Sequence, residues 1–270
     1  MGRDKRRIGR TAPDLATEIH MRRKMQALVR AMYKDIIQQV KPEYEKRIAE
    51  DKRNPNIAKD GIDRRFIIRL MKKSRMKWYP KFDELSKELA QWMSKKTYRR
   101  ADKIILQKLD EYGFTVHRNV DEGYQKAVLK EAVKDSVDLW HTLPQYAAAQ
   151  AQTTIMNAYA KGRDIGYLTE QLSDMAEISA ERAALIVRDQ MNKTTQTMAI
   201  ANAKSYGLQK GRWIHVAGEH SSRNTHVEFD GELFDLDTGL YDSDVGEYVK
   251  PGELIYCNCQ FVPVIPGFEE

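Results

Sequence analysis

The sequence predicts an α+β protein: a mainly α-helical N-terminal region with long helices, and a small C-terminal module of helices plus a short antiparallel β-sheet. Apolar residues recur at helical spacing from Leu15 to about residue 206. After Gly207 the pattern changes to short β-rich runs separated by Gly and Pro turns. The length of 270 residues allows one large or two modest domains with a real core.

The expected helices follow from this spacing. The first runs from Leu15 to Val40, and Pro42 is expected to break or restart it. The segment 51–56 contains Asn and Pro and predicts a loop. Further helices are expected at about 60–75, 80–110 (ending at a Tyr112-Gly113 C-cap), 120–138, 146–161 and 166–172. Ser179 resembles the N-cap of a last helix, which Gly207 ends.

The region after Gly207 is expected to form strands. One strand is expected at 212–216. The dipeptide Asp230-Gly231 is a hairpin-turn signal between two more strands, 226–229 and 232–234. The Asp- and Gly-rich stretch 235–248 predicts a loop, and 254–265 predicts a final strand that Pro263 interrupts.

We expect three parts along the chain: a basic disordered arm at 1–12, a basic helical region at 13–142, and a module at 143–270. In this module, helices extend to 206 and a β module covers 208–265. Residues 1–100 contain 29 Lys and Arg against 13 Asp and Glu, a net charge of +16, whereas the remainder has −10. The basic half could bind DNA phosphates non-specifically, and a solvated helical surface is the alternative interpretation. The candidate DNA-facing residues are Arg3, Lys5, Arg6, Arg7 and Arg10.

Three properties of the sequence bear on the location of the protein. No apolar run approaches the ~18 residues of a membrane helix, so no membrane partner is expected. No apolar stretch follows the basic N-terminus, which argues against a secretory signal. The two cysteines are Cys257 and Cys259, and this spacing suits a disulfide poorly, so we expect reduced thiols.

The residue types that bind metals gather in two short C-terminal clusters. In a strand the two cysteines would point to the same face. With His226 and one of His220 or His215 they could complete a Cys₂His₂ site, the usual geometry of structural zinc. We expect the ligands to be His220, His226, Cys257 and Cys259. Structural zinc cysteines normally have two to four residues between them, so two buried cysteines acting as small hydrophobes is the alternative.

A catalytic interpretation of the same residues also exists. His226-Val-Glu228 followed by the cysteines is faintly similar to the zinc deaminase signature, although the cysteine spacing differs and Pro251 is not adjacent to Cys257. The alternative function is therefore a metal-dependent hydrolase or deaminase-like enzyme that uses His226, Glu228, Cys257 and Cys259. We expect a protein without catalytic residues, and no cofactor other than this zinc.

Other polar residues are expected to act structurally. Arg223 could bind the carboxylate of Asp230 or Glu228, and Trp213 is expected in the core. On the helix after Ser179, Arg188 and Asp189 interrupt an apolar pattern, which favours a buried polar link to the β module. A solvated face with weak ion pairs is the alternative for this helix. The expected structural constellation is Arg182, Arg188, Asp189, Trp213, Arg223 and Asp230.

The order of these motifs carries a family resemblance over about residues 150–265. The helix segment Arg182-Ala-Ala-Leu-Ile-Val-Arg188-Asp-Gln190 is followed by Gly207 and Trp213, and then by Arg223-x-x-His226 and Asp230-Gly231. A Pro-Gly turn and a Cys-x-Cys segment ending in Val-Pro-Val264 complete the series. This resembles the phage Mu F-like minor head protein family, also called the phage head morphogenesis domain. Glu219-His220 departs from the acidic residues that the family usually shows there.

The resemblance implies a minor capsid protein of a tailed phage or prophage, present in few copies. It implies association with the portal protein, with the region 13–142 facing the portal or DNA, and help with head assembly and DNA packaging or delivery. The implied partners are the portal protein, the major capsid protein or scaffold, and double-stranded DNA. The implied location is the virion, with the bacterial host cytoplasm during assembly. The family supplies no catalytic residue.

Overall fold

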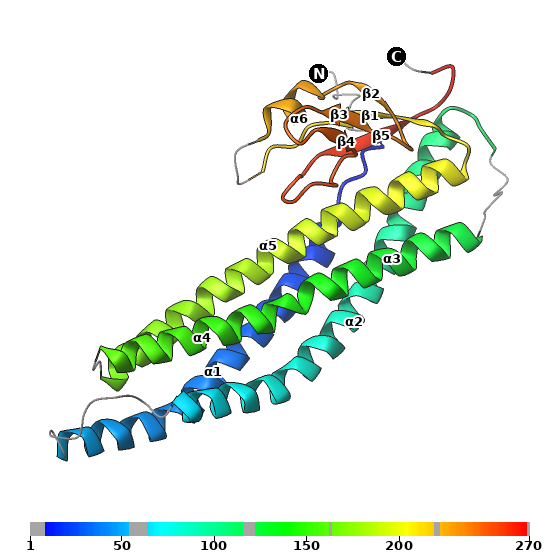
Figure 1. Cartoon of the computed structure of the whole chain (residues 1–270). Coiled ribbons are helices and arrows are strands. Elements are labelled where there is room, and N and C mark those ends of the chain that lie inside the picture. Colours follow the sequence, from blue (N-terminus) through cyan, green and yellow to red (C-terminus); the bar gives the residue numbers. More distant parts are fainter. Residues whose placement is uncertain (1–8, 54–63, 116–121, 162–163, 219–221, 269–270) are drawn as a thin grey trace, which may run out of the picture. The chain divides into compact units, whose positions relative to one another are not determined.

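A computed structural model describes residues 9–53, 64–115, 122–161, 164–218 and 222–268. Five long helices precede a small β region (Figure 1): α1 Leu15–Arg53, α2 Arg64–Glu111, α3 Glu122–Trp140, α4 Thr142–Ala160 and α5 Ile165–Ser205. The β region contains β1 Lys210–Ile214, α6 Asn224–Glu228, β2 Leu233–Asp235, β3 Leu240–Asp242, β4 Glu247–Val249 and β5 Gln260–Val264. All strand pairs are antiparallel, so the predicted α+β class is confirmed.

The chain forms two compact units, each assembled from distant segments. The sheet unit comprises residues 1–19, 89–136 and 187–270, and the helical unit comprises 20–88 and 137–186. Folding thus distributes the charge differently from the chain order. The helical unit has a formal net charge of +7 and the sheet unit of −1, because acidic residues of 137–186 join the basic segment 20–88.

The helical unit packs parts of α1, α2, α4 and α5. Met25, Met32 and Ile36 of α1 are fully buried. Asp35 accepts hydrogen bonds from Lys77 Nζ (2.6 Å) and Trp78 Nε1 (2.8 Å) of α2. These hydrogen bonds join α1 to α2.

Two expected helix breaks do not occur. Pro42 lies inside α1 and Pro80 inside α2, although each proline removes one backbone donor. Both positions have buried neighbours on either side: Val40 and Tyr44 around Pro42, and Trp78 and Phe82 around Pro80. Tertiary packing of these side chains therefore outweighs the local cost.

The N-cap expected at Ser179 is also wrong, because α5 runs through it without interruption. Ser179 is buried and its hydroxyl lies 3.0 Å from that of Tyr33, so the two share a hydrogen bond. The serine has a tertiary partner and does not need to cap a helix end. At the other end of α5, Gly207 has φ 78° and the expected stop is confirmed by Leu208 N–H donating to Ala203 O at 3.0 Å.

The sheet unit contains a three-stranded sheet of order β2-β1-β5 and a separate β3–β4 hairpin. Gly211 in the central strand lies opposite Phe234 and Pro263. A Cβ at Gly211 would come within 2.8 Å of the Phe261 ring and 2.9 Å of the Phe234 ring, so glycine permits both rings to pack there. Pro263 is tolerated because β5 is an edge strand.

Three expectations for the β region are wrong. Residues 226–229 form the end of a short helix and not a strand, because Phe229 N–H donates to Thr225 O at 3.0 Å. The expected loop 235–248 contains β3 and β4, whose three-residue length gives no visible alternation. Of the expected strand 254–265 only Gln260–Val264 is a strand, so both cysteines precede it in irregular backbone.

Part of the expected disordered arm is ordered. Thr11 is fully buried, and its backbone N–H donates to Phe261 O at 3.1 Å. Its hydroxyl lies 2.6 Å from Gln196 Oε1, and its carbonyl accepts from Gln196 Nε2 at 2.8 Å. Thr11 thus covers the outer edge of β5 and links it to α5. Arg3, Lys5, Arg6 and Arg7 lie outside the described residues, and Arg10 is half-buried.

Candidate metal centre

The structure brings three of the predicted metal ligands together in the sheet unit. The ligand atoms of His226, Cys257 and Cys259 all lie within 4.8 Å of one another, and all three side chains are buried. His226 Nδ1 is 3.3 Å from the Cys257 sulfur and 3.7 Å from the Cys259 sulfur. His215 Nδ1 lies 3.6 Å from the Cys259 sulfur, but His215 is not among the residues whose ligand atoms all lie within 4.8 Å of one another. His220 lies outside the described residues.

Short local structures position the two histidines. His215 directly follows β1, and its backbone N–H donates to the Asp230 carboxylate at 2.9 Å. His226 lies on α6, and its ring meets the buried Trp213 ring edge-on with centroids 5.3 Å apart. The aromatic core therefore fixes the plane of the His226 ring.

A buried carboxylate fixes the other ring nitrogen of His226. Asp242, the last residue of β3, is fully buried, and its Oδ2 lies 3.1 Å from His226 Nε2. The Nε2–H donates to this carboxylate, which leaves Nδ1 unprotonated toward the cysteines when the ring is neutral. The second carboxylate oxygen accepts from Asp244 N–H at 2.9 Å.

One face of α5 holds the cysteine segment. Asn192 Nδ2 donates to Cys257 O at 2.7 Å and to Cys259 O at 3.3 Å. One turn earlier, the Asp189 carboxylate accepts from Tyr256 N–H at 2.6 Å. Tyr256 has φ 60°, a left-handed conformation that is uncommon for a non-glycine residue. The backbone between the two bonds is thereby bent so that both thiols reach the histidine.

The turn before the cysteines approaches α5 closely. Gly252 has φ 75°, and a Cβ there would lie 2.8 Å from Gln196 Cγ and 3.0 Å from Asn192 Nδ2. Glycine at this position therefore serves both the turn and the contact with α5.

The electrostatics of the two thiols differ. Hydrogen bonding from Cys259 lowers the pKa of Cys257, burial opposes this, and His226 lowers the pKa further. Hydrogen bonding to Cys257 and burial raise the pKa of Cys259. The pKa values of the two thiols are therefore shifted in opposite directions. Burial also raises the pKa of Asp189, although the Tyr256 N–H opposes this.

The remaining predicted site residues have various positions. Arg223 donates to the Ile255 carbonyl at 3.1 Å, and not to a carboxylate as expected, because the cysteine segment lies beside α6. Arg188 lies 3.3 Å from Glu18 Oε1 of α1, within the sheet unit. Arg182 belongs to the helical unit, where its guanidinium lies 4.5 Å from the centre of the Tyr146 ring. Glu228 is exposed on α6.

Sequence reasoning missed three residues that support the cluster: Asn192, Asp242 and Gln196. Asn192 and Gln196 follow Asp189 at i+3 and i+7, so the three share one face of α5. This polar stripe in an apolar helix was a usable signal. Asp242 gave none, since it lies in an acidic segment that reads as a loop.

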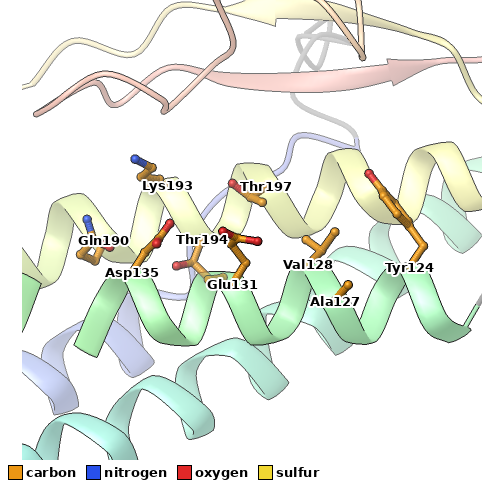
Figure 2. A pocket seen from close by; sticks show the side chains of 10 residues that line it. Tyr124, Ala127, Val128, Glu131, Asp135, Gln190, Lys193, Thr194 and Thr197 are labelled. Atoms are coloured by element: carbon orange, nitrogen blue, oxygen red, sulfur yellow. The ribbon is translucent and has the colours of Figure 1, made fainter. Parts of the chain in front are cut away.

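The sheet unit also has a groove between α3 and α5 (Figure 2), with a volume of about 320 Å³. Glu131 and Asp135 of α3 face Lys193 and Thr194 of α5 across it. This mixture of charges and hydroxyls defines no single chemistry, so the histidine–cysteine cluster is the candidate site.

Comparison with known proteins supports the predicted resemblance. Residues 149–262 match the family described as Phage Mu protein F like protein, so this region of the chain is similar to that family. The matched region includes His215, His226, Cys257 and Cys259.

A Haemophilus influenzae protein, named as uncharacterized, is 28% identical over 121 residues, which are 45% of this chain and 26% of that protein. The chain thus spans about a quarter of the length of that relative. No solved structure matches the chain. Among the described residues, no helix is long and apolar enough to cross a membrane.

Proposed function

We propose that this chain is a minor capsid protein of a tailed phage or prophage that binds the portal and assists head assembly and DNA packaging or delivery. The family match over residues 149–262 carries the proposal. In this proposal the protein is part of the virion and assembles in the host cytoplasm, beside the major capsid protein or scaffold.

The β3–β4 hairpin is the surface that we assign to a head partner. Tyr241 and Tyr248 are paired across it with ring centroids 5.4 Å apart, and they are 54% and 63% exposed. Val245 at the turn is also exposed. Exposed aromatic residues are enriched at protein interfaces and contribute much of their binding energy.

DNA is the second proposed partner. The helical unit has a formal net charge of +7 in the folded protein. Part of its basic charge is already neutralised, since Arg30 forms a two-pronged ion pair with Glu177 (2.7 and 2.9 Å). Because the unit keeps a net positive charge, we expect non-specific DNA binding whose affinity falls steeply as the salt concentration rises.

The enzymatic alternative has less support. A deaminase needs its glutamate beside the metal-bound water. Here Glu228 is exposed on α6 whereas His226 of the same helix is buried. His215 Nδ1 also lies 3.6 Å from the Cys259 sulfur, so a fourth protein ligand is available for the position that a catalytic site keeps open.

The test is co-purification of the full chain with the portal protein of the same phage, followed by mass spectrometry of purified virions. We expect the chain in portal rings and in virions, and we expect Tyr241→Ser/Tyr248→Ser to lose both while remaining folded. Tyr167→Ser, at an exposed position of the helical unit, is the matched control and retains both. Absence of the wild-type chain from virions and portal rings refutes the proposal.

A further inference from the structure

We infer that His226, Cys257 and Cys259 bind one Zn²⁺ ion that fastens the C-terminal module, and that His215 completes the site by a small movement of its side chain. The inference is independent of the proposed head function. It uses only described residues, and it replaces His220 of the predicted ligand set with His215.

The distances between ligand atoms agree with a tetrahedral zinc site. With Zn–S of about 2.3 Å and Zn–N of about 2.0–2.1 Å, a sulfur and a nitrogen ligand lie about 3.5 Å apart. Three of the four sulfur–nitrogen distances among these residues are 3.3, 3.6 and 3.7 Å. His226, Cys257 and Cys259 are therefore spaced as ligands of one ion, and His215 Nδ1, 3.6 Å from the Cys259 sulfur, needs a shift of its side chain to complete the tetrahedron. Two cysteines acting only as hydrophobes require no convergence on imidazole nitrogens.

The surroundings of His226 supply a second, independent observation. Its Nε2 lies 3.1 Å from the fully buried Asp242 carboxylate, so the free lone pair is on Nδ1 and faces the sulfurs. Histidines that bind zinc typically donate their other ring N–H to a carboxylate in this way, which fixes the tautomer and strengthens the ligand.

The ligand types select the metal and its role. Two thiolates with two imidazoles favour zinc among common divalent ions. Four protein ligands close the coordination sphere, so the ion is structural and not catalytic. The zinc ion would join the end of β1, helix α6 and the segment before β5. The sheet pairs β1 with β5 but includes neither α6 nor the segment before β5.

The test uses the full chain, expressed with Zn²⁺ supplied and purified without chelator, with elemental analysis as the first readout. We expect about one zinc per chain, as for a closed structural site. We expect Cys259→Ser and His226→Gln to lose it, and Asp242→Asn to bind about 10–100-fold more weakly. His20→Ala on α1, an exposed histidine, is the control and retains full zinc content.

Because ligand variants can fail to fold, the wild-type chain loaded with Co²⁺ provides a second readout. We expect intense visible bands of tetrahedral cobalt and a near-ultraviolet band from thiolate ligands, with His215→Ala altering the visible bands. A wild-type chain without bound zinc, or a cobalt spectrum without thiolate or tetrahedral character, overturns the inference. Stoichiometric iron or copper in place of zinc overturns the choice of metal.

Discussion

Replacing Asn192 with leucine should weaken the C-terminal module markedly. The Asn192 side chain is buried and supplies the hydrogen bonds described for both cysteine carbonyls, one short at 2.7 Å and one longer at 3.3 Å. Leucine has a similar volume but no donor, so both carbonyls lose this partner. A buried polar group without its partner costs about 1–3 kcal/mol. The long second bond adds less, and we expect a loss of about 2–4 kcal/mol in the free energy of unfolding.

The assay is urea denaturation of the full chain, followed by tryptophan fluorescence, since Trp213 is buried beside the cluster. Asn157→Leu is the matched control because Asn157 is exposed on α4 and the change in helix propensity is the same. We expect the control within about 0.5 kcal/mol of the wild type. If the two variants differ by less than that, the Asn192 amide does not hold the cysteine segment.

Two further outcomes follow from buried or partly buried polar contacts. Thr11→Val removes the hydroxyl that meets Gln196 at 2.6 Å, so we expect a loss of about 1–3 kcal/mol by denaturation. Thr11→Ser should recover most of this, and equal stability of the valine and serine variants would contradict the bond. Burial alone would raise the pKa of Asp35, but hydrogen bonds from Lys77 and Trp78 lower it. The hydrogen-bonded Asp35 carboxylate therefore stabilises the protein at pH values above the ordinary pKa of an aspartate. This contribution is lost as the pH falls through the lowered pKa of Asp35. Asp35→Asn should lower the free energy of unfolding by under ~1 kcal/mol at pH 7 and by nothing in strong acid. A difference between variant and wild type that stays constant from pH 7 to strong acid would refute this assignment.

Much of the helical architecture could be predicted from local pattern. The helix C-caps at Gly113 and Gly207 follow from glycine chemistry, and both have positive φ as expected. The interior prolines and Ser179 were misjudged for one reason. Tertiary structure outweighs their local preferences: Tyr44 and Phe82, two residues after the two prolines, are buried, and Ser179 bonds to Tyr33, which is 146 positions away in the sequence.

The candidate site shows the same division. Residue types alone identified His226, Cys257 and Cys259, because few other functions require these residues so close together. The predicted set took His220 in place of His215, because sequence spacing does not state which residue lies near a sulfur across a turn. His215 lies 3.6 Å from the Cys259 sulfur, and His220 lies outside the described residues. The strand argument for the thiols was wrong, because α5 and the left-handed Tyr256 set the cysteine backbone.

The sequence by itself determined the helical periodicity, the switch to β structure after Gly207, the types of the metal-binding residues and the order of motifs that resembles the phage Mu F-like family. These are properties of neighbours along the chain. Tertiary structure decided which distant groups meet: Asp242 with His226, Asn192 with both cysteines, and Thr11 with β5. Each contact joins residues at least 16 positions apart, and burial of their polar groups requires a partner that no local pattern specifies.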